Sequence, residues 1–418
     1  MAPLIFCLLA AALAEDLTTA PPQSEQASFE GSQVLTIFAE NRPDIEKIVE
    51  EENIDIWAEN KTHMDIFLPG EKVDVLKGKF SANQINFSIK INDVDAAIRE
   101  QNPPPSEEDE ELDGRKGHKM NWDKYQRLDV IYGYMDYLAQ TYPNLVTTGV
   151  IGNSYENRPI KYIRISSGKP NPNVFVIDGG IHAREWISPA TTAYIIRELV
   201  ENRGSLPADL QEVEFYIVPV VNPDGYEYTH IGNRLWRKNK SRSYVTCSGT
   251  DLNRNFAHSW GGKGTSGNPC SEIYRGRSAL SENESRALAN FIQGLRNVKA
   301  YVTFHSYGQF ILIPYGYDYN AFPPDFKEME RVAIRASHAM ARSGGQHYTV
   351  GNTAHTLYPA SGGSDDWVKA QTGATYVYTI ELRDKGNYGF TLPARQILPT
   401  AKEAYEAVKV IAAAAARS

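Results

Sequence analysis

The chain has 418 residues, with 42% hydrophobic and 22% charged side chains, and this balance is typical of a globular protein. The length exceeds that of one ordinary domain, so we expect one large domain and one smaller one. The net charge of −8 and the lack of a basic stripe argue against nucleic-acid binding. After the N-terminus, no run approaches the roughly 20 apolar residues that a membrane span requires.

The N-terminus has the pattern of a signal peptide. Residues 4–14 are apolar, end in the small-x-small pattern of residues 12–14, and are followed by two acidic residues. We predict that residues 1–14 are cleaved after Ala14 and that the mature protein is secreted and extracellular, with a digestive lumen as one such location. The alternative is a buried helix of similar length.

A small domain is predicted after the signal peptide. Strand-like runs alternate with stretches of helical spacing in the order β-α-β-β-α-β, which fits a small α+β open sandwich of the ferredoxin-like kind. The strands are expected at residues 34–38, 54–58, 63–68 and 85–91, and the helices at residues 42–52 and 72–78.

A charge boundary separates this domain from the rest of the chain. Residues 1–116 contain 10 Lys and Arg against 24 Asp and Glu, whereas residues 117–418 contain 33 against 27. At the boundary, three prolines precede an acidic run and the basic pair Arg115-Lys116, as in an exposed, protease-sensitive linker. We predict a pro-domain at residues 15–100, a linker with an activation cleavage site at 101–119, and a catalytic domain at 120–418. Opposite net charge favours docking of the two parts. A merely solvated charged loop is the alternative.

The second part is predicted to be one α/β domain. Its apolar strands and its helices alternate, which indicates a mixed, mostly parallel central sheet flanked by helices. The clearest strands are residues 173–177, 215–220, 300–304 and 376–380, and the clearest helices are residues 190–202, 282–295, 326–341 and 401–416. Ligands of such sheets bind beyond the carboxyl ends of the strands. No phosphate-cradling glycine loop is present.

Two cysteines remain once Cys7 has left with the signal peptide, namely Cys247 and Cys270. In an oxidising compartment they are expected to form a disulfide. Zinc ligation is the competing interpretation, but two cysteines without a close C-x-x-C spacing make a poor structural zinc site.

Three potential metal ligands follow predicted strands. His182 and Glu185 come after the strand at 173–177, and His305 ends the run at 300–304. Two His and one Glu are an established ligand set for catalytic zinc, which needs three protein ligands and one open position. His-x-x-Glu alone is weak, and an ordinary loop is the alternative for that motif.

Six segments of the second part resemble, in the same order, the signatures of the pancreatic-type metallocarboxypeptidases, the procarboxypeptidase A and B family. They are residues 179–189 (GGIHAREWISP), 233–238 (NRLWRK), 251–255 (DLNRN), 305–307 (HSY), 358–364 (YPASGGS) and 381–384 (ELRD). The first part is similar to the family's activation segment. The resemblance implies a secreted zymogen of a zinc-dependent exopeptidase that hydrolyses C-terminal residues of peptides and proteins. It also implies inhibition by the chain's own pro-domain, activation by a trypsin-like protease, and a monomer.

The resemblance assigns roles in the reaction. It implies one Zn²⁺ per chain, held by His182, Glu185 and His305. Glu381 matches the family's general base and acid. Arg237 matches the cation that stabilises the developing oxyanion, and Asp251 matches a partner that orients His182.

Further residues match the substrate-binding surface of the family. Asn253 and Arg254 resemble the clamp for the terminal carboxylate, because a guanidinium can hold a carboxylate through two parallel hydrogen bonds. Tyr358 resembles the mobile tyrosine that closes over the bound terminus, and Arg184 resembles a secondary anion contact. Ser306 and Tyr307 are assigned to the same surface.

Substrate preference depends on Asp365. In the family this position lies at the base of the pocket for the terminal side chain, where Asp suits Lys and Arg because a buried carboxylate needs a cationic partner. Asp365 therefore resembles the B-type branch. One alternative is that Asp365 caps the helix that begins near Asp366. Gly316 and Thr353 also line the pocket by alignment and do not both follow the usual B-type pattern, so the choice between Lys and Arg stays open.

Two other functions remain as alternatives. The first is A-like specificity for aromatic or aliphatic C-termini, with Asp365 facing away from the substrate. The second is a catalytically silent peptide-binding relative, which would require the loss of a metal ligand or of the base, and neither loss is visible in the sequence.

Overall fold

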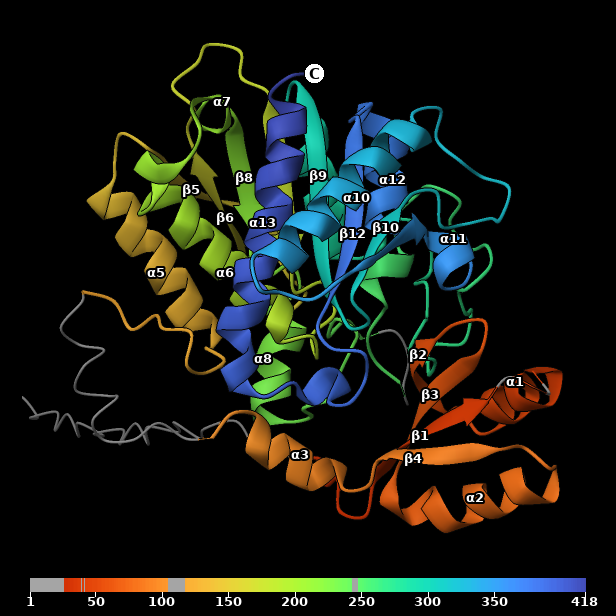
Figure 1. Ribbon diagram of the computed structural model, residues 1–418. Coiled ribbons are helices and arrows are strands. Elements are labelled where there is room, and N and C mark those ends of the chain that lie inside the picture. The colour runs from red at the N-terminus through yellow and green to blue at the C-terminus, as the bar shows by residue number, and fades with distance from the viewer. Residues whose placement is uncertain (1–25, 39, 41, 104–116, 243–246) are drawn as a thin grey trace, which may run out of the picture.

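The computed structural model describes residues 26–38, 40, 42–103, 117–242 and 247–418. The predicted signal peptide and the Arg115-Lys116 pair lie outside the described residues. A small N-terminal domain lies against one end of a larger C-terminal domain (Figure 1). Among the described helices, none is both long and apolar enough to cross a membrane.

The N-terminal domain is an antiparallel four-stranded sheet with two helices on one face. It consists of β1 (Gln33–Phe38), α1 (Arg42–Glu51), β2 (Asp55–Glu59), β3 (His63–Leu68), α2 (Val73–Ala82) and β4 (Phe87–Ile91), and its strand order is β2-β3-β1-β4. Side chains of a strand alternate between faces, so Leu35 and Ile37 pack against the helices while Val34 points to the opposite face. The predicted β-α-β-β-α-β sandwich is confirmed.

A further helix, α3 (Val94–Gln101), continues from this domain and is not predicted by the sequence analysis. It begins at Asp93, whose side chain caps the helix by accepting a hydrogen bond from the amide of Ala96. The helix ends at Gln101, which the sequence analysis placed at the start of the exposed linker. That placement is wrong for Gln101, because its side chain is 1% exposed and donates to the carbonyls of Phe390 and Leu392.

The C-terminal domain is built on an eight-stranded mixed sheet in the order β11-β10-β12-β9-β7-β8-β6-β5. Four of its pairings are parallel and three antiparallel, so the predicted mixed, mostly parallel sheet is confirmed. The strands are β5 (Val146–Asn153), β6 (Pro159–Ile165), β7 (Val174–Gly179), β8 (Glu214–Val218), β9 (Val298–Ser306), β10 (Phe310–Ile313), β11 (Thr349–Asn352) and β12 (Tyr376–Leu382).

Helices cover this sheet, as expected of strands that are buried along their whole length, such as β7 (Figure 1). Helix α13 packs against both α6 and α10, and α9 packs against α12. The helices are α5 (Leu128–Thr141), α6 (Ile187–Val200), α7 (Ala208–Gln211), α8 (Pro223–Ile231), α9 (Asn283–Gly294), α10 (Phe326–Arg342), α11 (Thr353–Thr356), α12 (Ser364–Thr372) and α13 (Ile397–Ala415).

The central strands β7, β9 and β12 run parallel and end at the same edge of the sheet. In the register, Gly179 lies opposite Phe304, and His305 lies opposite Glu381. The loop after β7, the last residues of β9 and the last residues of β12 therefore meet at one place, as expected of a ligand site in an α/β sheet.

An apolar cluster joins the two domains across this edge. Phe29, Val34, Trp57, Ile91 and Val94 come from the N-terminal domain and α3, and Leu235, Tyr307 and Phe390 come from the C-terminal domain. The indole of Trp57 lies 5.0 Å from the ring of Phe390. Burial of these side chains stabilises the docked arrangement of the domains.

Candidate active site

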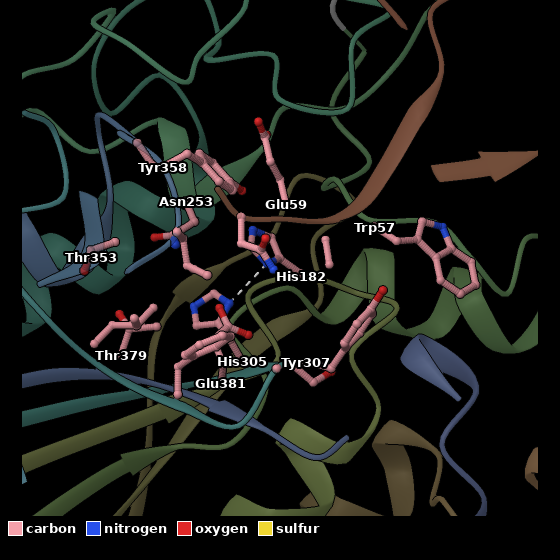
Figure 2. Close-up of a pocket in the computed structure, with 18 of the residues that line it drawn as sticks. Trp57, Glu59, His182, Asn253, His305, Tyr307, Thr353, Tyr358, Thr379 and Glu381 are labelled. Carbon is pink, nitrogen blue, oxygen red and sulfur yellow. Dashed lines mark hydrogen bonds between the residues drawn. The ribbon is translucent and has the colours of Figure 1, made fainter. Parts of the chain in front are cut away.

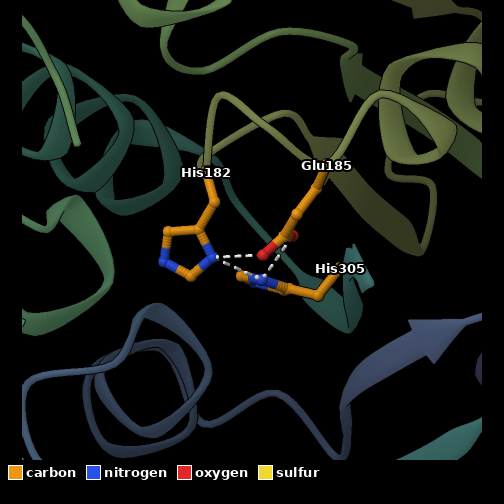
Figure 3. Close-up of side chains that lie close together, drawn as sticks. All are labelled: His182, Glu185 and His305. Carbon is orange, nitrogen blue, oxygen red and sulfur yellow. Dashed lines mark hydrogen bonds and ion pairs between the residues drawn. The ribbon is translucent and has the colours of Figure 1, made fainter. Parts of the chain in front are cut away.

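His182, Glu185 and His305 converge at the carboxyl edge of the sheet (Figure 3). The first two lie in the loop between β7 and α6, and the third lies near the end of β9. Their ligand atoms all lie within 4.8 Å of one another, and all three side chains are buried. Nδ1 of His182 is 2.8 Å from Oε1 of Glu185, and Nδ1 of His305 is 3.2 Å from Oε2.

This arrangement fits a cation. Nδ1 of His182 and Nδ1 of His305 face one another at 3.2 Å beside the carboxylate, so three potential lone-pair donors point at one place. Although burial alone would raise the pKa of Glu185, the two histidines hold it well below its usual range. Burial alone would lower the pKa of His305, but Glu185 raises it to about 9. A bound cation would take the place of that proton.

Asp251 connects this triad to Arg237. One oxygen of its fully buried carboxylate lies 3.1 Å from Nε2 of His182, and the other accepts hydrogen bonds from Nε and Nη2 of Arg237 at 3.2 and 2.9 Å. Burial opposes ionisation of Asp251, but Arg237 and His182 keep its pKa well below the usual value. Asp251 therefore fixes the ring of His182 and the guanidinium of Arg237 at the same time.

Glu381 lies in β12 beside His305, inside the sheet edge rather than beyond it. Burial raises the pKa of its carboxyl to about 8, and the nearby His305 partly offsets this effect. A carboxyl with so strongly raised a pKa in a cleft is suited to taking up and giving back a proton.

One cavity of about 330 Å³ contains most of the predicted site residues (Figure 2). It is lined from the C-terminal domain by His182, Glu185, Arg237, Asn253, Arg254, His305, Ser306, Tyr307, Tyr358, Asp365 and Glu381, among others. Trp57, Glu59, Asn60, His63 and Asp65 line it from the N-terminal domain. The N-terminal domain therefore covers the cavity. Of the predicted site residues, Arg184 and Asp251 do not line it.

Asn253 and Arg254 present polar groups to this cavity. The side-chain oxygen of Asn253 accepts a hydrogen bond from the amide of Ser364 at 2.9 Å. Arg254 donates from Nε to the carbonyl of Gly264 and from Nη1 to the carbonyl of Asn253. Its Nη2 makes no hydrogen bond to any residue that the structure describes, so it remains available to a bound group.

Asp365 lies in the first turn of α12 and lines the cavity. Its Oδ2 accepts a hydrogen bond from Oγ1 of Thr379 at 3.0 Å. The helix is preceded by Gly363, and no side chain caps its N-terminus. The alternative role of Asp365 as a helix cap is therefore wrong. The neighbouring Asp366 instead bonds the backbone amide of Gly316.

Cys247 and Cys270 form the predicted disulfide, with Cα atoms 5.2 Å apart. The loop next to the disulfide contacts the N-terminal domain, because the side-chain amide of Asn53 donates to the carbonyl of Cys270 at 3.3 Å.

Comparison with known proteins places the chain in a family. Residues 131–407 match the family described as zinc carboxypeptidase, and residues 39–101 match the carboxypeptidase activation peptide. The chain belongs to the zinc carboxypeptidase family. Members of this family use one Zn²⁺ per chain, so the protein is a metallocarboxypeptidase, and its N-terminal domain is the family's pro-domain.

Similar proteins include both main types of carboxypeptidase. The chain is 44% identical to carboxypeptidase B of Astacus astacus over 70% of this chain and 97% of the relative. It is 39% identical to carboxypeptidase A4 of Mus musculus over 92% of this chain and 93% of the relative. The crystal structure of thrombin-activatable fibrinolysis inhibitor is 34% identical, has a TM-score of 0.82, and covers 93% of this chain and 100% of that chain.

Within this carboxypeptidase, Arg184 is bound to the pro-domain. Its guanidinium donates to both oxygens of Asp55, at 2.5 and 3.1 Å, and stacks over the ring of Phe390. Its side chain is 1% exposed. The resemblance predicted an anion contact for Arg184, and in the precursor the anion is a carboxylate of the pro-domain.

Two contributors to the site were missed by the sequence analysis. Thr379 could have been found, because it is two residues before Glu381 in a strand and must therefore lie on the same face. Asp55 could not have been found, because no local pattern indicates a partner 129 residues away.

Proposed function

We propose that this protein is the secreted precursor of a carboxypeptidase that removes C-terminal Lys or Arg from peptides and proteins. The observation that carries the proposal is Asp365, which is 6% exposed, lines the cavity and has a hydroxyl donor but no cation beside it in the described structure. A cationic side chain that enters the cavity would supply the counter-charge that a buried carboxylate requires.

We propose that His182, Glu185 and His305 hold the zinc ion, and that Asp251 orients His182. When bound, zinc polarises the scissile carbonyl and lowers the pKa of water toward about 7. Glu381 lies next to His305 and is the carboxylate that accepts the proton of the attacking water and then passes it to the leaving amine.

Cationic and amide groups that line the same cavity would bind the substrate. Arg237 is fixed by Asp251 and can stabilise the negative charge that develops on the carbonyl oxygen. Asn253 and Arg254, with its free Nη2, can hold the terminal carboxylate. Tyr358 lines the same cavity and can cover the bound terminus. Ser306 and Tyr307 would contact residues upstream of the scissile bond.

We further propose that the protein is a zymogen activated by a trypsin-like protease. The pro-domain covers the cavity, and the basic pair Arg115-Lys116 provides a cleavage point between the pro-domain and the catalytic domain. A similar protein is named as thrombin-activatable. The apolar N-terminal run supports secretion through a signal peptide at residues 1–14. We expect the active species to be a monomer.

The second candidate is an A-like enzyme for aromatic or aliphatic C-termini. The relatives named carboxypeptidase A4 and A2 favour it, because they are 39% and 37% identical over 92% of this chain, whereas carboxypeptidase B of Bos taurus is 36% identical over 97%. In that case Asp365 would not contact the terminal side chain.

The two candidates differ in their substrates. Rates would be measured on matched peptides that end in Lys, Arg, Phe or Leu, before and after mild trypsin treatment. The proposal predicts hydrolysis of the Lys and Arg peptides that increases after trypsin. Faster hydrolysis of Phe and Leu peptides would favour the A-like candidate, and equal rates before and after trypsin would contradict the zymogen.

A further inference from the structure

The wall of the cavity near Asp365 includes a close contact between Thr353 and Gly316. A Cβ atom added to Gly316 would lie 3.0 Å from the Cγ2 methyl of Thr353, so this methyl fills the space that a side chain at Gly316 would need. The hydroxyl of Thr353 donates to the carbonyl of Ile313 at 3.2 Å, which holds the side chain in this orientation. Figure 2 shows Thr353 and Thr379 at the same end of the cavity.

This wall is held in place on both sides. The amide of Gly316 donates to both oxygens of Asp366, at 2.8 and 3.0 Å, and its carbonyl accepts from the amide of Ala360 at 2.8 Å. The side chain of Asn352 caps α11 and also donates to the carbonyl of Tyr315 at 2.8 Å. Movement of Thr353 away from the cavity would break its hydrogen bond to Ile313 and disturb the hydrogen bonds of the neighbouring Asn352.

The carboxylate of Asp365, at this end of the cavity, already has one hydrogen-bond partner. Oδ2 of Asp365 accepts from Oγ1 of Thr379, whereas no protein donor among the described residues bonds its Oδ1. Since Thr379 donates its only proton to Asp365, its oxygen keeps lone pairs that can accept a further hydrogen bond. A compact ammonium group can use Oδ1 of Asp365 and Oγ1 of Thr379 together.

Lysine and arginine place different demands on this geometry. The lysine ammonium is a compact charge on a narrow stem, whereas the arginine guanidinium is a wide planar fork that bonds best to two free carboxylate oxygens. Thr353 lines the same cavity as Asp365, with its methyl against Gly316, and Thr379 already bonds one oxygen of Asp365.

We infer that the enzyme prefers C-terminal lysine over arginine, and that Thr353, supported by Thr379, sets this preference. The inference rests on the proposed specificity for basic C-termini. A difference of about one methyl group in a rigid pocket corresponds to a discrimination of roughly tenfold or more.

The test uses the trypsin-activated enzyme and peptides that differ only in the last residue: Lys, Arg or Phe. The parent enzyme is expected to have a kcat/KM about tenfold higher for Lys than for Arg. Thr353→Gly, which removes the whole side chain, should bring the ratio of kcat/KM for the Lys peptide to that for the Arg peptide close to one. Thr353→Ser keeps the hydroxyl that bonds Ile313 and removes only the methyl, so it should shift the ratio in the same direction. Thr379→Val frees Oδ2 of Asp365 and should raise kcat/KM for the Arg peptide relative to that for the Lys peptide.

The outcomes separate this inference from the proposed function. If Phe is cleaved faster than both basic residues, the basic specificity itself is wrong. If Lys and Arg are both preferred over Phe but Arg equals or exceeds Lys, only the lysine preference is overturned. If the parent prefers Lys and the ratio is unchanged in both Thr353→Gly and Thr353→Ser, Thr353 is not the determinant. Equal zinc content of the variants excludes a general defect of the site.

Discussion

Arg184 of the catalytic domain and Asp55 of the pro-domain form a paired contact, with Nη1 2.5 Å from Oδ2 and Nη2 3.1 Å from Oδ1. The indole nitrogen of Trp57 donates to the same Oδ2 at 3.1 Å. Arg184 directly precedes Glu185, one of the proposed zinc ligands, so the pro-domain is attached directly beside the proposed catalytic centre.

Loss of this contact should weaken latency. Asp55→Asn leaves the buried guanidinium without its carboxylate, and breaking one partner of such an interfacial pair costs about 2–5 kcal/mol. In a precursor that also carries Arg115→Gln and Lys116→Gln to prevent cleavage at the basic pair, activity on long peptides should rise at least tenfold. Asp74→Asn, on the exposed side of α2, is the matched control and should leave latency unchanged. Unaltered activity of the Asp55 variant would show that the contact does not contribute to inhibition.

Removal of the metal should abolish activity and lower thermal stability. A bound zinc ion would be coordinated by the buried His182, Glu185 and His305 at once, and its removal takes this stabilising interaction away. A strong chelator should therefore also lower the Tm. Added zinc should restore both quantities in the parent. A His305→Asn variant should retain less zinc and recover little activity. Full activity of a metal-free preparation would contradict the assignment of these ligands.

Asp365→Ile should invert the substrate preference. A buried carboxylate left unpaired by an aromatic terminus costs about 3–5 kcal/mol, by analogy with broken buried ion pairs. At about 1.36 kcal/mol per factor of ten, this corresponds to roughly two to three orders of magnitude in kcat/KM between Arg and Phe peptides. The substitution should reverse that difference, so that Phe peptides are hydrolysed faster than Arg peptides, while the zinc content stays unchanged. If the variant still prefers Arg peptides, Asp365 does not determine the preference for basic C-termini.

The pH profile should report the raised pKa of Glu381. Burial raises this pKa to about 8 in the absence of metal, and the positive charge of zinc acts in the opposite direction. Since the ionised form is the base, kcat/KM should increase with pH along an acid limb. The apparent pKa should lie above the ordinary value of about 4.3 and below about 8. A profile that is already flat at pH 5 would be incompatible with a buried Glu381 as the base. The variant Glu381→Gln should have a kcat/KM about 10²–10⁴-fold lower than that of the parent.

Much of the fold follows from local sequence patterns. The strands β7, β9 and β12 are mostly apolar on both faces, as expected of strands buried between helices, and this pattern predicts them from the sequence. In contrast, β5 (Val146–Asn153) contains Gly149 and Gly152 and is only partly buried at the sheet edge, so its periodicity is weak. Helix α3 was missed because the adjoining prolines and acidic residues dominate the composition of that region.

The site was predictable where its residues occur in compact motifs. His182 and Glu185 are three residues apart, and the parallel register of β9 and β12 then brings His305 and Glu381 to the same edge. The contacts of Arg184 with Asp55 and of Arg234 with Gln101 were not predictable, because they join the two domains through side chains far apart in the sequence. Such pairings depend on how the domains dock and leave no local periodic signal.

The apolar cluster between the domains has a consequence for preparing the protein. Leu235, Tyr307 and Phe390 are each less than 10% exposed in the precursor, where they pack against Trp57 and its neighbours. Once the pro-domain has left, these three side chains form a water-facing apolar surface beside the active site, and such surfaces promote self-association. The precursor is therefore the form to express, concentrate and store, and activation is best carried out in dilute solution shortly before use.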